Sequence, residues 1–208
     1  MATQTDRGIT DRLPLKRGAV FGAVSFLVSY ILTLIIVAAA EANDFTDDLV
    51  EAAGWIYYNA QLADVKISIP QSNDDAIPDI VFDRTINYVT DNQVSDGGFT
   101  LEMPSVVYHL IPLLSLVLFG FLLARYVGVQ TTQDGALAGG TVILGSVPLT
   151  LIGVFLFSAE FDGVELSPVL LESILFVGVL FPLIFGAIGG AISAQLAHHF
   201  DRTEVNRR

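Results

Sequence analysis

Four long apolar stretches constrain the fold of this chain more than any other feature of its sequence. They cover residues 18–40, 106–124, 135–159 and 169–197, and none has a charged residue near its middle. A helix needs about 20 apolar residues to cross a hydrocarbon layer of about 30 Å. Because a helix satisfies all its backbone groups internally, it is the form in which single apolar segments cross lipid. The sequence therefore predicts an all-α membrane protein with a four-helix transmembrane bundle.

The composition agrees with this class. Hydrophobic residues make up 52% of the chain and the mean hydropathy is +0.61, which exceeds what a soluble surface tolerates. The first stretch also resembles a signal peptide, because basic residues precede it and it ends in Ala38–Ala40. Its 23 residues exceed the usual apolar core of about 7–15 residues, so we expect it to stay as a membrane helix.

The distribution of cations predicts the orientation in the membrane. Lys and Arg near the ends of membrane helices stay on the cytoplasmic side. Eight of the ten cations lie in or beside residues 1–17, 125–134 and 198–208, which we expect to be cytoplasmic. The opposite segments, 41–105 and 160–168, hold sixteen acids and two cations, so we expect them to be extracellular. The predicted location is the cell membrane, with both termini in the cytoplasm.

The balance of charged residues indicates a source and excludes some partners. The net charge is −12, only two of the ten cations are Lys, and fifteen of the acids are Asp. Such a surface stays hydrated at multimolar salt, where screening weakens self-repulsion, so we predict a halophilic archaeal source. The same charge disfavours nucleic acid as a partner. With no cysteine, disulfides, thiolate metal sites and iron–sulfur clusters are excluded.

The segment 41–105 is long enough for a small α+β insertion between the first two membrane helices. A helix is predicted that is capped by Thr46, holds Asp47 and Asp48 in its first turn and continues over Leu49–Leu62. Two placements of this helix are open. Its Trp and Tyr rings suit the surface of the outer leaflet, and they equally suit a small buried core above the bundle.

Strands are predicted on either side of a polar loop. Residues 65–69 and 99–103 alternate apolar and polar side chains, as strands that pair into a sheet do. The segment Pro70–Pro78 between them is polar and is expected to be a loop.

The chain also contains an apparent internal duplication. Residues 18–37 and 135–154 share ten identities in twenty positions at an offset of 117. The second and fourth apolar stretches agree less well, with Pro112/Pro182 and Gly120/Gly190 as matching pairs. We predict two duplicated helical hairpins related by an axis along the membrane normal, with residues 41–105 inserted into the first hairpin.

Small residues along these stretches predict where the helices pack. Helices associate in lipid by close packing, for which Gly and Ser let two backbones approach. We expect packing within the chain, although the same residues allow a homo-oligomer or a membrane-protein partner. The predicted packing residues are Gly18, Gly22, Ser29, Gly135, Gly139, Ser146, Gly186 and Gly190.

Two ionisable residues lie inside the apolar stretches. Glu172 and His109 sit about one turn into matching stretches, so we expect them at similar depth. An ionisable group at the centre of a membrane helix costs roughly 2.5–3.5 kcal/mol, which requires a reason. A Glu–His pair would relay protons or bind a cation. The favoured alternative places both side chains at the headgroup level, where they are hydrated.

Other polar clusters do not predict a site. His198 and His199 are adjacent on a helix and point in different directions, so they do not share one metal easily. The acids Asp74, Asp75 and Asp79, with Asp83, lack the Gly and final Glu of an EF-hand loop. The chain has no nucleophile elbow, phosphate-binding loop, dinucleotide fingerprint or HExxH helix. The sequence predicts no enzyme, no metal site and no cofactor.

Three motifs carry a resemblance to a known group of proteins. They are Arg17-Gly18-Ala19-x2-Gly22, Ser29-Tyr30-x-Leu32-Thr33 and Gly54-Trp55-Ile56-Tyr57-Tyr58-Asn59-Ala60. With these motifs the chain resembles uncharacterised haloarchaeal multi-pass membrane proteins without an assigned function. Gln61 stands where that group leads us to expect His. The resemblance implies a source and a membrane location, and no activity.

Two functional classes remain in competition. The leading hypothesis is a non-enzymatic membrane scaffold or accessory subunit, in contact with membrane lipids, because packing residues are abundant and no catalytic constellation occurs. The alternative is a small channel or transporter that uses Glu172 and His109. A continuous polar path between the hairpins would favour transport, and a dry centre packed by Gly and Leu would favour the scaffold.

Overall fold

The computed structural model describes residues 13–40, 48–71, 80–90, 101–161 and 163–205. Within these residues, four helical spans are long and apolar enough to cross a membrane, which confirms that part of the prediction. The first two are the helices α2 (Leu15–Ala40) and α4 (Ser105–Val127). The third consists of α5 (Thr132–Gly140) and α6 (Ile143–Leu156). The fourth runs through α7 (Leu170–Glu172), η1 (Ser173–Leu180) and α8 (Phe181–Val205).

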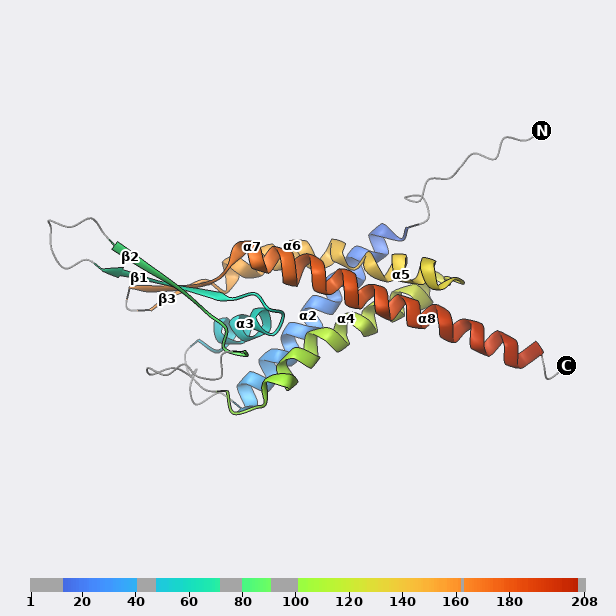
Figure 1. Cartoon of the computed structure of the whole chain (residues 1–208), viewed down its shortest axis with the longest axis horizontal. Coiled ribbons are helices and arrows are strands. Elements are labelled where there is room, and N and C mark those ends of the chain that lie inside the picture. Colours follow the sequence, from blue (N-terminus) through green and yellow to red (C-terminus); the bar gives the residue numbers. More distant parts are fainter. Residues whose placement is uncertain (1–12, 41–47, 72–79, 91–100, 162, 206–208) are drawn as a thin grey trace, which may run out of the picture.

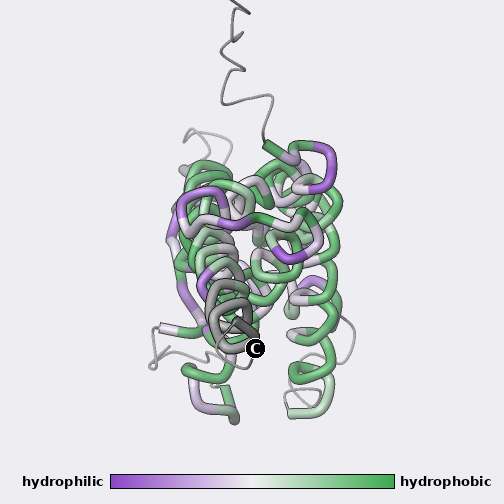
Figure 2. The backbone as a smooth tube through the Cα atoms, turned by 90° about the vertical axis from the view of Figure 1, so that its right-hand side faces the viewer, coloured by the Kyte–Doolittle hydropathy of each residue, from purple (hydrophilic) through white to green (hydrophobic). Residues whose placement is uncertain are grey.

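The spans form a bundle that opens toward one end. Helix α8 packs along α4 and α5, and α2 packs against α4 and α6. Toward the left of Figure 1, α2 and α4 diverge from α6 and α7, and a shorter helix, α3 (Leu49–Asn59), lies between the two pairs. Seen along the bundle in Figure 2, the helices are coloured mainly as hydrophobic. We call the end beside α3 and the strands the sheet end. At the opposite end, α2 begins and α8 ends.

The third span is not one regular helix, as the prediction over 135–159 assumed. It breaks at Thr141 and Val142, between α5 and α6. Two features weaken the helix there: Gly139 and Gly140 have low helix propensity, and the Thr141 hydroxyl donates to the Ala138 carbonyl at 2.6 Å. The two parts of the span have different packing partners: α5 packs against α8, whereas α6 packs against α2 and η1.

The part of the fourth span nearer the sheet end has an unusual backbone. Residues Ser173–Leu180 form a π-helix, and the N–H of Phe181 donates to the carbonyl of Phe176, five residues earlier. π-Helices are rare and normally last one turn. Pro182 follows directly and has no N–H to donate. Within this segment, Gly178 lies beside Val147 and Thr150 of α6.

An antiparallel sheet of four strands occupies the sheet end, in the order β2-β1-β4-β3. Its strands are β1 (Val65–Gln71), β2 (Ile80–Ile86), β3 (Ala159–Phe161) and β4 (Val164–Pro168). Ile67 of β1 lies between Arg84 of β2 and Leu166 of β4. Segments 41–105 and 160–168, which are far apart in the sequence, therefore contribute strands to one sheet.

The sheet corrects one strand prediction. The strand at 65–69 is present, but residues 101–103 form no strand, and residues 99–100 lie outside the described residues. Residues 80–86 pair with β1 in place of the predicted strand 99–103, and residues 164–168 pair with the other edge of β1. Of the predicted loop Pro70–Pro78, Pro70 and Gln71 belong to β1, and residues 72–79 lie outside the described residues.

Helix α3 belongs to the core. Every residue from 52 to 61 is buried. Trp55, Tyr57 and Tyr58 pack with Val154 of the third span and Val177 of the fourth in one hydrophobic cluster. Of the two placements that the sequence left open, the buried core is the observed one. The aromatic side chains do not need the membrane surface, because their polar atoms have partners inside the protein.

Candidate functional site

Among the described residues, buried polar contacts are concentrated in α3 and in the turn that follows it. On one side, α3 forms hydrogen bonds with α6 and with the residue that follows α6. Trp55 Nε1 donates to the Phe157 carbonyl at 2.6 Å, and the Tyr58 hydroxyl donates to the Thr150 carbonyl at 2.7 Å. A Cβ atom added to Gly153 would collide with the Tyr58 hydroxyl. The absence of a side chain at Gly153 therefore makes room for the bond from Tyr58 to α6.

On its other side, α3 is bonded to α2. The Tyr30 hydroxyl donates to the Val50 carbonyl at 3.1 Å, and the rings of Phe26 and Tyr57 meet edge to face with centroids 5.1 Å apart. Burial raises the pKa of both Tyr57 and Tyr58 above the ordinary value of a tyrosine. Burial thus favours the protonated hydroxyl in both residues, and in Tyr58 this hydroxyl is the donor to the Thr150 carbonyl.

The turn after α3 is organised by two asparagines. Asn59 donates from Nδ2 to the Ala63 carbonyl at 2.8 Å and accepts at Oδ1 from the Tyr88 N–H at 2.9 Å. Asn87 donates from Nδ2 to an Asp64 carboxylate oxygen at 3.0 Å. The two side chains fasten the turn to the segment that leaves β2. Asn59 lies in the motif Gly54–Ala60, but its role was not predicted, because its partner Tyr88 is 29 residues away and both partner groups belong to the backbone.

Glu172 and His109 both bind this turn. A carboxylate oxygen of Glu172 accepts from the Asp64 N–H at 2.8 Å. His109 Nδ1 lies 2.7 Å from the Ala60 carbonyl, and since a carbonyl only accepts, this nitrogen carries the proton. The structure thus brings the two predicted residues to one turn, but both of these bonds go to its backbone and neither joins the residues to each other. Their geometry is that of anchors for Ala60–Asp64.

The bond from Glu172 leads to a stability prediction. We expect Glu172→Gln to lower the free energy of unfolding by less than about 1 kcal/mol, because the amide oxygen still accepts from the Asp64 N–H. Glu172→Leu removes the acceptor and should lower it by about 1–3 kcal/mol. Unfolding of the purified protein in detergent measures both changes. Equal losses in the two variants would contradict an acceptor role.

The predicted packing residues all lie buried in the bundle. Six of them are glycines at which an added Cβ would collide with a neighbouring span: Gly18, Gly22, Gly135, Gly139, Gly186 and Gly190. Ser29 and Ser146 are buried on α2 and α6.

The matched glycines have different neighbours. Gly22 in the first span faces the Val142 carbonyl of the third span, whereas its counterpart Gly139 faces the Gly186 carbonyl of the fourth. The identities between the spans do not translate into identical contacts, and the duplication with its axis stays a prediction.

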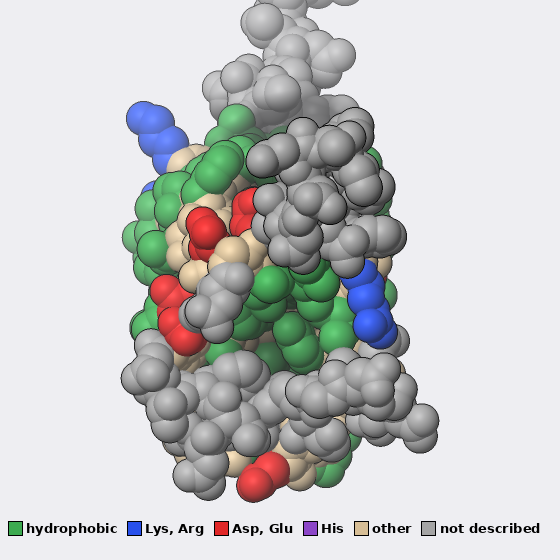
Figure 3. All heavy atoms as spheres, turned by 90° about the vertical axis from the view of Figure 1, so that its left-hand side faces the viewer, with side chains coloured by type: hydrophobic (Ala, Val, Ile, Leu, Met, Phe, Trp, Pro, Cys, Tyr) green, Lys and Arg blue, Asp and Glu red, His purple; other side chains and the backbone are tan. Residues whose placement is uncertain are grey.

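Charged groups at the sheet end form local contacts. Lys66 Nζ lies 2.9 Å from a carboxylate oxygen of Asp83, and the Ser68 hydroxyl donates to Asp83 at 3.0 Å. The hydrogen bond from Lys66 is the main cause that lowers the pKa of the Asp83 carboxyl. Acidic side chains are visible on this end face in Figure 3. Among the described residues, no three His, Asp or Glu side chains gather as metal ligands would.

The side chains of the remaining predicted clusters lie outside the part of the chain that the structure describes. Asp74, Asp75 and Asp79 fall in a part of the chain that the structure does not describe, and the side chains of His198 and His199 are likewise not described, although both residues belong to α8.

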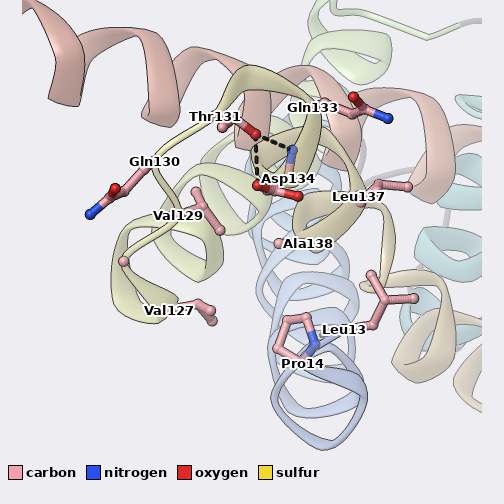
Figure 4. Close-up of a pocket in the computed structure, with 11 residues that line it drawn as sticks. Leu13, Pro14, Val127, Val129, Gln130, Thr131, Gln133, Asp134, Leu137 and Ala138 are labelled. Atoms are coloured by element: carbon pink, nitrogen blue, oxygen red, sulfur yellow. Dashed lines mark hydrogen bonds between the residues drawn. The ribbon is translucent and has the colours of Figure 1, made fainter. Parts of the chain in front are cut away.

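An open pocket of about 600 Å³ lies at the end opposite the sheet, between the start of α2 and the loop from α4 to α5. Its one charged lining residue is Asp134, whose N–H and carboxylate both bond to the Thr131 hydroxyl at the start of α5 (Figure 4). This is the N-cap of α5, which Thr131 provides through its side chain. The acid of the pocket is thus used in helix capping.

Taken together, the described residues define a helical protein with four membrane-length apolar spans, a small antiparallel sheet and a buried helix that closes the bundle at the sheet end. The four spans are compatible with a multi-pass membrane protein. Residues 1–197 match a family described as a family of unknown function (DUF7978), and the chain belongs to this family. No curated protein and no solved structure matches the chain.

Proposed function

We propose that the protein is a non-enzymatic scaffold or accessory subunit of the cell membrane, with both termini in the cytoplasm and the sheet outside. The observation that carries the proposal is the placement of α3. This helix fills the opening of the bundle, its residues from 52 to 59 are buried, and Glu172 and His109 bind the turn that follows it. The two ionisable residues that a transporter would use are engaged in holding the structure together.

The other half of the bundle supports the same conclusion. Gly139 and Gly190 face the carbonyls of Gly186 and Gly135 across the contact between α5 and α8, and Gly120 faces Gly186 from α4. Such approaches leave no space for a side chain, let alone a hydrated ion. A bundle closed by backbone contacts at one end and by α3 at the other is suited to holding partners rather than to passing solutes.

One observation favours the alternative, a small channel or transporter. The hydroxyls of Ser25, Thr150 and Ser173 are buried and have no hydrogen-bond partner within the described residues. Buried hydroxyls without partners are places where water enters a membrane protein. In this alternative, movement of α3 would connect these hydroxyls to Glu172 and His109.

The two functions are separated by a flux measurement combined with crosslinking. The full chain in proteoliposomes should show no proton or cation flux above empty vesicles. In native membranes, a photocrosslinker at the exposed Glu165 of β4 should capture one discrete membrane-protein partner, and one at the exposed Leu114 of α4 should capture lipid only. Flux that Glu172→Gln and His109→Gln abolish would overturn the scaffold in favour of transport.

The proposed orientation predicts a labelling pattern. The chain has no cysteine, so single cysteines report cleanly. In intact cells, Glu165→Cys at the sheet end should react with a membrane-impermeant maleimide, and Gln130→Cys at the opposite end should react only after permeabilisation. Both positions are exposed, so access within the protein is matched. The reverse pattern would show that the sheet faces the cytoplasm.

The proposed halophilic source predicts salt dependence. Segments 41–105 and 160–168 carry sixteen acids and two cations, whose self-repulsion weakens as salt screens it. We expect the sheet end to resist protease at multimolar potassium chloride and to lose that resistance at low ionic strength. Cleavage sites within these segments, mapped by mass spectrometry, measure the effect. Equal resistance in both conditions would contradict a halophilic origin.

A further inference from the structure

A groove runs along the outside of the bundle between α2 and α4. Its volume is about 390 Å³. It is lined by Val28 and Leu32 of α2 and by seven residues of α4 from Val107 to Phe119, and Ser115 is the single polar side chain among them. Both helices are membrane-length apolar spans, so this groove faces hydrocarbon when the spans lie in a membrane. The groove is therefore suited to an alkyl chain.

Two arginines continue the walls of this groove toward the end opposite the sheet. An α-helix has 3.6 residues per turn, so residues seven or eleven apart lie on one face. Arg17 precedes Val28 by eleven residues on α2, and Arg125 follows Leu118 by seven residues on α4. Both arginines are exposed. Each wall of the groove thus ends in a guanidinium group at the same end of the bundle.

Aromatic side chains connect the groove to these cations. Phe119 lines the groove and meets Phe21 edge to face, with ring centroids 6.4 Å apart. Phe21 in turn lies 6.0 Å from Tyr126, and the Arg17 guanidinium lies 4.9 Å above the Tyr126 ring. A cation over an aromatic face is attracted by the ring and is oriented by it. The surface from Leu118 to Arg17 is thus continuous in space, apolar at one end and cationic at the other.

The distances along this surface match one leaflet. With a rise of 1.5 Å per residue, Arg17 lies about 16 Å along α2 from Val28. Half of a hydrocarbon layer is about 15 Å thick. A phosphate at the level of the arginines therefore places the lipid tail beside Phe119, Leu118 and Val28. Arg17 and Arg125 are two of only ten cations in a chain of net charge −12, and their local positive charge is complementary to a phosphate.

From this geometry we propose that the groove between α2 and α4, with Arg17 and Arg125, is a binding site for one anionic phospholipid. The two guanidinium groups bind the phosphate, for which their paired N–H donors are well suited, and one alkyl chain lies in the groove. The site is independent of the scaffold proposal, since a transporter would hold the same lipid. It differs from general lipid contact because two helices supply one headgroup site and one tail site together.

Native mass spectrometry of the full chain, released from detergent with added phosphatidylglycerol or phosphatidylcholine, tests this site. The wild-type protein should retain one phosphatidylglycerol in preference to phosphatidylcholine. Arg17→Gln with Arg125→Gln should lower that retention about tenfold, as expected for loss of charge-assisted hydrogen bonds. Leu118→Trp, at an exposed position, should also lower it by filling the groove. Elution volume on size exclusion verifies that each variant is folded.

Lys16→Gln is the matched control. Lys16 is exposed at the same depth and carries the same charge, but it points away from the face of α2 that holds Arg17, Phe21 and Val28. Retention of the lipid in Lys16→Gln supports the site. An equal loss in Lys16→Gln would show attraction by surface charge alone and overturn it. Displacement by millimolar glycerol phosphate, or unchanged retention in Leu118→Trp, would likewise overturn it, because the tail would then contribute nothing.

Discussion

Tyr58→Ala is expected to lower the free energy of unfolding by about 3–5 kcal/mol, a large fraction of the stability of a domain of this size. Tyr58 has no exposed surface and packs in the cluster that joins α3 to the third and fourth spans. Truncation leaves a cavity between α3 and α6 and also removes the bond to the Thr150 carbonyl. Denaturant unfolding of the purified protein, followed by the fluorescence of Trp55 on the same helix, measures the loss.

Tyr58→Phe is the control that separates packing from hydrogen bonding. It keeps the ring and removes only the hydroxyl, so we expect a loss of about 1 kcal/mol. If α3 were a loosely held element resting on the surface, both variants would lose less than about 1 kcal/mol. That outcome would contradict the placement of α3 in the core, and with it the main support for a closed bundle.

The spans were predictable from the sequence because hydrocarbon imposes a simple rule on length and composition. The same rule says nothing about where a span breaks. The interruption at Thr141 depends on a local competition between a side-chain hydroxyl and the backbone, and on the packing of α5 and α6 against different partners. The first effect is local and the second is tertiary, and neither changes the apolar pattern over 135–159.

The sheet was only partly predictable, for a related reason. The alternation in 65–69 marked β1 correctly, but strand partners are chosen over long distances in sequence. Val164–Pro168 joins β1 from beyond the second and third spans, and its short apolar–polar pattern is no stronger than that of residues 99–103. A pattern of period two identifies strands weakly and does not identify their neighbours.

The roles of Glu172 and His109 show a different limit. Their presence in apolar stretches correctly marked them as residues that need partners, and their similar depth predicted that they would be near each other. What the sequence did not contain was the turn Ala60–Asp64, whose backbone groups receive both side chains. Backbone partners leave no residue-type signature. The sequence therefore offered a Glu–His pair or, as the favoured alternative, two hydrated side chains, and neither includes the two separate bonds to this turn.

Gly139→Leu is expected to destabilise the bundle by about 3 kcal/mol, at the upper end of overpacking effects. The Cβ atom of the new leucine would collide with the backbone of α8, at the Gly186 carbonyl and near the Gly190 Cα. Backbone atoms cannot rotate away as a side chain can, so α5 and α8 must separate along their whole contact. Thermal unfolding in detergent measures the change. Ala38→Leu provides the control, because Ala38 is exposed on α2 and the added side chain meets no neighbouring span.

Gly22→Leu extends the test to the proposed duplication. Gly22 matches Gly139 in sequence and faces the Val142 carbonyl, so we expect a loss of similar size, about 3 kcal/mol. The two contacts are neighbours, because Gly22 faces Val142 and the Val142 side chain lies against Gly186, which Gly139 faces. The double variant therefore measures how strongly the two contacts are coupled. Strong coupling between them would mean that the two contacts form one structural unit. Losses below about 1 kcal/mol in both single variants would show that the shared glycines do not hold the spans together, and that their identity reflects composition rather than a repeated packing surface.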